Sequence, residues 1–236
     1  MITGIMMTAK RGRFIVSKKD NIAEQPGFGA LLTMVAGAID AYTFMLHGEV
    51  FAGLQTGNLI LLGLNLGKGQ FEMSVRYALS LLAFFLGTIL IRLLQRSHWF
   101  KNADKFRRQM ILAYEFMLLV IVAVIGQILP NLLTTSILSM AAAAELQEFR
   151  RLAGGPFTPL MMTGNLRTLA ESSFDAIIYH ETSAQQKLKV TGLIMVTFAL
   201  GAGLVAGLIP LLGAFTILFP AGLIVIAFLL ITFNNH

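Results

Sequence analysis

Gly37-Ala-Ile-Asp40-Ala-Tyr-Thr-Phe44 opens the most informative segment of this chain, which continues through His47-Gly48-Glu49-Val50-Phe51 to Gln55-Thr56-Gly57-Asn58-Leu59. The segment places a carboxylate late in an apolar run, interrupts the run with glycines and resumes it at a Thr-Gly-Asn step. The same plan returns 107 positions later, with Gln147 in place of Asp40, Gly154-Gly155 in place of His47-Gly48, and Thr163-Gly164-Asn165-Leu166 in place of Thr56-Gly57-Asn58-Leu59. Because the motif, the break and the apolar approach recur at one constant offset, the sequence predicts an internal duplication.

The composition is that of a membrane protein. Of the 236 residues, 56% are hydrophobic and only 13% are charged, and the mean hydropathy is +0.74. The apolar residues come in long uncharged blocks, which is typical of bilayer-spanning helices. The net charge of +6 comes from basic residues in short loops between these blocks, so we do not expect a nucleic-acid partner. The chain has no cysteine and its four histidines are scattered, so neither a disulfide framework nor a metal site is predicted.

Eight apolar segments follow one another along the chain, at about 27–46, 51–66, 74–94, 110–129, 132–149, 157–170, 190–209 and 211–233. Six of them are long enough to cross a hydrocarbon core of about 30 Å. The segments 51–66 and 157–170 are short, begin beside Gly or Pro, and contain the Thr-Gly-Asn step. We expect these two to be broken or re-entrant helices.

The distribution of basic residues favours six spans. If all eight segments cross, eight Lys and Arg residues face outward and nine face inward. If 51–66 and 157–170 return to the side from which they enter, fifteen lie inside and only Lys68 and Arg76 outside. Cytoplasmic loops carry the Lys/Arg excess, so the second arrangement is favoured, with both termini in the cytoplasm. Charge counting alone does not distinguish a re-entrant hairpin from a short helix that crosses obliquely.

We therefore predict an all-α polytopic helical membrane bundle, in which six spans and two short broken helices form a 3+3 inverted repeat. Residues 1–26 would be a basic cytoplasmic tail, and residues 27–129 and 130–236 the two repeats of one membrane domain. Many secondary transporters have this plan, with broken helices that meet near the midplane to form the solute site.

Asp40 is the strongest single candidate for a functional side chain. An ionisable group in a spanning helix costs about 2.5–3.5 kcal/mol, so it normally faces a cavity or a partner. One interpretation is a carboxyl group that hydrogen-bonds a neighbouring helix; the other is a group that binds a solute or a proton. The polar Gln147 at the equivalent position of the second half favours the latter.

The two Thr-Gly-Asn steps, Thr56-Gly57-Asn58 and Thr163-Gly164-Asn165, are expected to cap short helices. Their exposed amide groups would also attract an anionic ligand if they face a cavity. We predict that these six residues line a substrate site together with Asp40 and Gln147.

Charged residues surround the second break. Glu148 and Arg151 are three positions apart and Arg167 and Glu171 four, so the sequence predicts helical ion pairs that lock or gate the inner mouth. Glu115 is a further intramembrane carboxylate candidate, although it is close enough to a basic end to snorkel. Small residues at four-residue spacing indicate close helix packing; they are Gly29, Thr33, Gly37, Ala41, Gly203 and Gly207.

The segments quoted above resemble the YoaK-like family of bacterial inner-membrane proteins, a group of unknown function. In the first half the matching residues are Gly37, Asp40, Ala41, Phe44, Gly48, Val50, Phe51, Thr56, Gly57 and Asn58. In the second half they are Gln147, Arg150 or Arg151, Thr163 and Gly164. The resemblance covers nearly the whole chain after residue 26, and it implies a small multi-pass protein of the bacterial inner membrane.

Two functions are compatible with these features. The first is a secondary transporter or facilitator that carries a small solute, or a proton with it, through a cavity at the interface of the repeats. The alternative is a non-transporting membrane adaptor or assembly protein that docks partners through its basic loops. Motifs for nucleotide binding or nucleophilic catalysis are missing from the sequence, so we expect neither an enzyme nor a cofactor.

Overall fold

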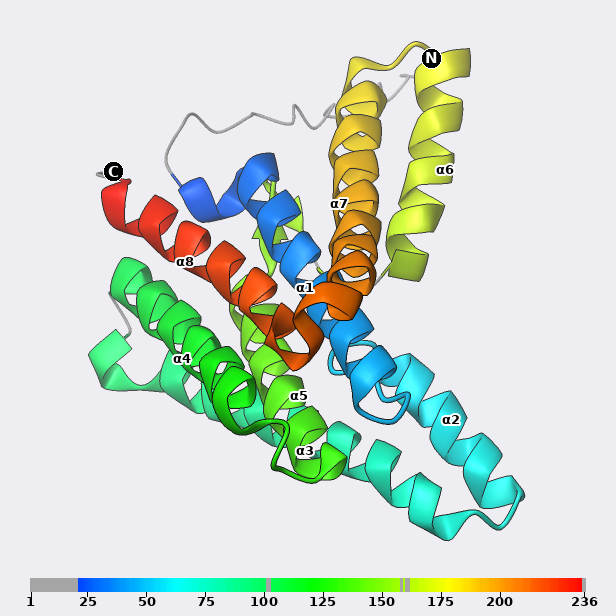
Figure 1. The fold of residues 1–236 in the computed structure, drawn as a ribbon. Helices are drawn as coiled ribbons and strands as arrows, with labels where there is room; N and C mark the ends of the chain where they lie inside the picture. The colour runs from blue at the N-terminus through cyan, green and yellow to red at the C-terminus, as the bar shows by residue number, and fades with distance from the viewer. Residues whose placement is uncertain (1–20, 101–102, 158, 160–161, 235–236) are drawn as a thin grey trace, which may run out of the picture.

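The computed structural model describes residues 21–100, 103–157, 159 and 162–234. This part of the chain is nearly all helical, as the sequence predicted (Figure 1). The helices are α1 Pro26–Leu46, α2 Gln55–Gly67, α3 Phe71–Arg96, α4 Asp104–Ile125, α5 Asn131–Glu148, α6 Met162–Ile178, α7 Thr182–Leu212 and α8 Leu218–Phe233. Three 3-10 helices (η1 Ile22–Glu24, η2 His98–Phe100 and η3 Gly213–Ile217) and a small antiparallel hairpin of β1 Arg151–Leu152 and β2 Gly155–Pro156 complete it. The predicted basic tail lies, up to residue 20, outside the described residues.

Local sequence sets several helix boundaries. Pro26 occupies the first turn of α1, where its missing N–H has no intrahelical partner to lose. Pro130 is the N-cap residue of α5 and lies directly before its first helical residue. Gly213 ends α7 with a φ of 55°, a left-handed conformation that suits glycine, and the chain turns there through η3 into α8.

The helices pack in a regular set of pairs. α1 packs on α7 and α8, whereas α5 packs on α3 and α4. α2 pairs with α3, α6 pairs with α7, and α4 and α8 pack on each other. In Figure 1 the α2–α3 and α6–α7 pairs extend from the same side of the molecule, one below and one above.

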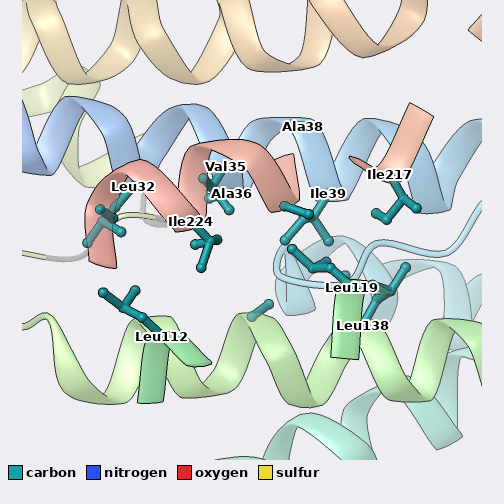
Figure 2. Packing of buried hydrophobic residues seen from close by; sticks show 14 of the residues in the cluster. Leu32, Val35, Ala36, Ala38, Ile39, Leu112, Leu119, Leu138, Ile217 and Ile224 are labelled. Atoms are coloured by element: carbon teal, nitrogen blue, oxygen red, sulfur yellow. The ribbon is translucent and has the colours of Figure 1, made fainter. Parts of the chain in front are cut away.

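The main hydrophobic core lies where α1, α4, α5 and α8 converge. Figure 2 shows Leu32 and Val35 of α1 facing Ile224 of α8, with Leu112 and Leu119 of α4 on the other side. All five side chains are fully enclosed. α1 and α5 are the helices most surrounded by protein, with 13 of 21 and ten of 18 residues buried.

Close contact between α1 and α7 depends on Gly37 and Gly201. A Cβ atom at Gly37 would collide with the carbonyl oxygen of Phe198, and one at Gly201 would collide with that of Met34. The predicted packing role of Gly37 is therefore confirmed. The same prediction for Gly203 and Gly207 is wrong, since a Cβ there has no described atom within 4 Å. Gly203 lies two residues after Gly201, about 200° around the helix, on the side facing away from α1.

Hydrogen bonds between helix termini define two ends of the bundle. We call one of them the basic end. There the last turns of α3 and α5 contact the first turn of α4. Lys105 of α4 also donates a hydrogen bond to the carbonyl of Thr232, near the end of α8. η1 lies there too, since Arg108 binds Asn21. At the opposite end, His47 after α1 contacts Asn131 of α5.

Four stretches of the described chain are long and apolar enough to cross a membrane: Pro26–Leu46, Phe71–Arg96, Asp104–Ile125 and Thr182–Phe233. The last has 52 residues and contains α7, η3 and α8. α5 is not among them, because its alanines, threonines and glutamates make it less apolar. The predicted total of six spans therefore stays a prediction.

Candidate functional site

The side chain of Asp40, in α1, caps the N-terminus of α2. Its hydrogen-bond donor Gly53 lies 13 residues further along the chain. Asp40 lies in the last third of α1 and is 4% exposed. One carboxylate oxygen, Oδ1, accepts hydrogen bonds from the backbone N–H of Gly53 at 2.6 Å and of Leu54 at 3.4 Å. Leu54 is the N-cap residue of α2 and offers no side-chain cap, so Asp40 caps this helix from α1. The other oxygen, Oδ2, has no hydrogen-bond partner among the described residues.

Asn58 anchors the loop that precedes α2. Its Oδ1 accepts from the backbone N–H of Phe51 at 2.9 Å, and its Nδ2 donates to the carbonyl of Phe51 at 2.7 Å. The same amide donates to Ser80 of α3, whose hydroxyl lies 2.7 Å from that of Ser139 on α5. The fully buried Asn58 therefore ties α2, α3 and α5 together.

The second Thr-Gly-Asn step does not repeat this arrangement. Thr163 and Gly164 are exposed, and Asn165 is half-buried, with its amide 3.8 Å from the sulfur of Met162. In the first step Thr56 is also exposed, whereas Gly57 packs against the ring of Phe51. The two copies share a sequence but differ in the partners of their asparagines.

Because the two asparagines differ in their partners, the role of Asn58 can be tested with Asn165 as the matched control. Asn58→Leu leaves the N–H of Phe51 without an acceptor and removes the amide's hydrogen bonds to the carbonyl of Phe51 and to Ser80, so we expect the free energy of unfolding to fall by about 2–3 kcal/mol. Asn165→Leu should change it by less than about 0.5 kcal/mol. Unfolding of both purified variants by SDS titration in mixed micelles measures the difference. Equal effects would show that Asn58 is not the anchor.

The other predicted binding residue, Gln147, lies at the basic end. Its Nε2 donates to Oε1 of Gln95 at 3.0 Å, and Gln95 in turn binds Glu148. The structure thus gathers Asp40, Gly57 and Asn58 around the loop 51–54, and places Gln147 and Thr163–Asn165 elsewhere. A cavity of about 150 Å³ lies between α3 and α4, lined by apolar side chains and Arg107; none of the predicted binding residues lines it.

The ion pairs at the basic end differ from those expected. Glu148 does not pair with Arg151; it binds Arg107 of α4 at 3.0 Å and lies 3.7 Å from Arg108. α5 ends at Glu148, so no helical turn brings Arg151 alongside, and Arg151 pairs with Glu24 at 3.7 Å. The predicted Arg167–Glu171 pair forms at 2.9 Å, on an exposed face of α6.

Two buried glutamates complete the polar interior. Glu115 of α4, a candidate intramembrane carboxylate in the sequence, is fully buried and does not reach the basic end, because its position in the helix faces the core together with Leu112 and Leu119. Glu145 of α5 is 2% exposed and lies beside it, with Asp40 the next carboxyl group. Sequence periodicity carries the signal for Glu115, which falls on the buried stripe of α4. It carries none for Glu145, because α5 is buried on all sides from residue 141 to 145.

At the opposite end, His47 is buried with Nδ1 3.0 Å from Oδ1 of Asn131. Burial lowers the pKa of His47, and the hydrogen bond to Asn131 partly offsets this effect. The imidazole is therefore neutral at pH 7, and its Nε2 has no hydrogen-bond partner among the described residues.

Long apolar helices around a few buried carboxyl groups are typical of an integral membrane protein. The chain belongs to the family described as "Protein of unknown function (DUF1275)", whose profile matches residues 28–230. Neither a curated protein nor a solved structure matches the chain.

Proposed function

We propose that this protein is a secondary transporter of the bacterial inner membrane that carries a small polar solute between its two halves, with both termini in the cytoplasm. The observation that carries the proposal is a buried pair of carboxyl groups at the contact between the halves, with a third buried carboxyl group, that of Asp40, as the next one along the core. Asp40 and Glu115 come from the first half and Glu145 from the second. Ionisable groups are expensive inside a bilayer, and where they occur they mark ion or substrate pathways.

The packing of the helices supports an inverted repeat of six spans and two short helices. If α1 is exchanged with α5, α2 with α6, α3 with α7 and α4 with α8, the pairs α1–α7 and α1–α8 become α5–α3 and α5–α4, and α2–α3 becomes α6–α7. The equivalent helices also run in opposite directions. α1 and α4 begin at the basic end, whereas α5 and α8 end there. Transporters with this symmetry change access by moving one half against the other.

The loop 47–54 supports the location of the solute path. It leaves helical geometry between α1 and α2, and its residues Val50 and Ala52 are fully buried. Non-helical backbone at membrane depth is tolerated only where protein covers it or where it lines a cavity. Asp40 contacts this loop with one oxygen and leaves the other available to a solute or a proton.

Asp40→Asn tests the proposal in liposomes that hold the purified protein. A panel of labelled amino acids, sugars and organic acids is offered with and without an inward proton gradient. We expect the protein to take up at least one of them, and Asp40→Asn to abolish the gradient-driven part. The fold should persist, because the amide oxygen of the substituted side chain still accepts from Gly53.

Asp175→Asn, at a half-buried position on α6, is the matched control and should transport like the native protein. Uptake that is the same in protein-free liposomes for the whole panel would contradict the transporter. Gradient-driven uptake that survives Asp40→Asn would remove Asp40 from the mechanism.

A further inference from the structure

We infer that Glu115 of α4 and Glu145 of α5 form a proton-binding pair, and that Asp40 of α1 is the next acceptor on the proton's path. The inference rests on the proposed transport function and names its coupling ion. It concerns a site that spans both halves of the chain.

No hydrogen-bond donor among the described residues reaches the carboxyl groups of Glu115 and Glu145. The exposed fractions of Glu115 and Glu145 are 0% and 2%, and none of their four carboxyl oxygens has a hydrogen-bond partner among the described residues. Buried oxygens normally accept hydrogen bonds, and two adjacent carboxylates without counter-ions repel each other in a medium of low dielectric constant. One proton resolves both problems, because a protonated carboxyl group donates an O–H···O bond to its neighbour.

The nearby basic side chains form ion pairs with another carboxylate. Arg107 and Arg108, on the same helix as Glu115, face Glu148 at 3.0 Å and 3.7 Å. The remaining elements packed on the pair supply no cation. The buried residues of α8 and η3 include no titratable group, and those of α3 include only Tyr77. Asp40 is the titratable group that α1 presents to the pair.

The pair offers fewer side-chain ligands than a metal ion needs. No group of three or more His, Asp or Glu side chains within the described ranges has the arrangement to hold a metal. A proton needs only the two facing oxygens, whereas hard cations require about six oxygen ligands.

The Glu115–Glu145 pair lies between other titratable side chains, which would allow a proton to move along the core. Glu145 lies one turn before Glu148 at the basic end, and Asp40 lies two turns before His47 at the opposite end. Titratable side chains therefore follow one another through the core, from Arg107–Glu148 through Glu145–Glu115 and Asp40 to His47. Such rows of ionisable groups act as proton relays in membrane pumps and transporters.

Infrared spectroscopy of the purified full chain tests the pair. At pH 7 the native protein should show the carbonyl stretch of a buried, protonated carboxylic acid. We expect the double variant Glu115→Gln/Glu145→Gln to lose this band and each single variant to shift it. Glu72→Gln, at an exposed position of α3, should leave it unchanged.

A thermal melt separates binding from a structural role. Removing two facing acids should leave the Tm of the double variant equal to or above that of the native protein, whereas a structural pair would lower it. A native protein without the band, a band that survives the double variant, or a band removed by added Na⁺ at pH 7 would overturn the proton pair.

Uptake measured on the same samples keeps this inference apart from the proposed function. The band without any solute uptake would leave the proton pair standing and count against transport. Gradient-driven uptake by the double variant would leave transport standing and overturn the pair as its coupling site.

Discussion

Gly201→Ala should prevent α1 and α7 from packing and should lower the free energy of unfolding by about 3 kcal/mol or more, the upper part of the range for overpacking. The new Cβ would collide with the backbone carbonyl of Met34, which cannot rotate away as the end of a side chain could. Gly37→Ala should act in the same way against the carbonyl of Phe198. The measurement is SDS titration of the purified variants, with monodispersity on a sizing column as a second readout.

Gly203→Ala provides the matched control on the same helix. Its Cβ would meet no described atom within 4 Å, and alanine has a higher helix propensity than glycine by about 0.8–1.0 kcal/mol. We therefore expect Gly203→Ala to be neutral or stabilising. A loss of stability at Gly203 as large as that at Gly201 would show that the α1–α7 contact is not the cause.

Arg107→Gln should cost about 3–5 kcal/mol, since it leaves a buried carboxylate without its partner. The side chain of Glu148 is 1% exposed and that of Arg107 is 14% exposed. The guanidinium binds both oxygens of Glu148, with Nε 3.1 Å from each, and Nη1 also binds Asp104 at 2.7 Å. Arg108, at 3.7 Å, is too far to replace these bonds.

Two further variants test whether the loss of stability in Arg107→Gln comes from the unpaired buried charge of Glu148. Arg107→Leu combined with Glu148→Leu removes both charges and should recover most of the stability, because apolar replacements of a buried pair are often neutral or stabilising. Arg167→Gln breaks an exposed pair on α6 and should cost at most about 1 kcal/mol. If Arg107→Gln resembled Arg167→Gln, the Glu148 pair would not be a buried lock at the basic end.

These predictions connect the fold to the proposed transport cycle. The α1–α7 contact lies at the junction between the halves, and the Arg107–Glu148 pair closes the basic end one turn beyond Glu145. In the proposed cycle, a solute that moves between the halves passes the carboxyl groups near these contacts. The residues that we propose for transport are therefore close to, but different from, those that we expect to stabilise the bundle.

The apolar segments of the sequence predicted the helices but not their full lengths. The segment 157–170 corresponds to α6, Met162–Ile178, and the segment 190–209 to α7, which already begins at Thr182. Hydropathy finds only the apolar part of a helix, whereas α6 and α7 continue through charged, exposed residues such as Glu171 and Lys187. The start of α1 at Pro26 was predicted to within one residue by the segment 27–46, because proline favours the first turn of a helix.

The sequence by itself determined the all-helical class, the membrane-type apolar segments and the placement of Asp40 in a buried helix, because hydropathy, periodicity and proline positions act over a few residues. Only the tertiary structure decided which polar groups meet. Asp40 caps a helix 13 residues away, Glu115 lies beside Glu145, and Glu148 binds Arg107 instead of the nearby Arg151. These partners depend on how each helix is rotated and packed, and residue spacing along the chain does not contain that information.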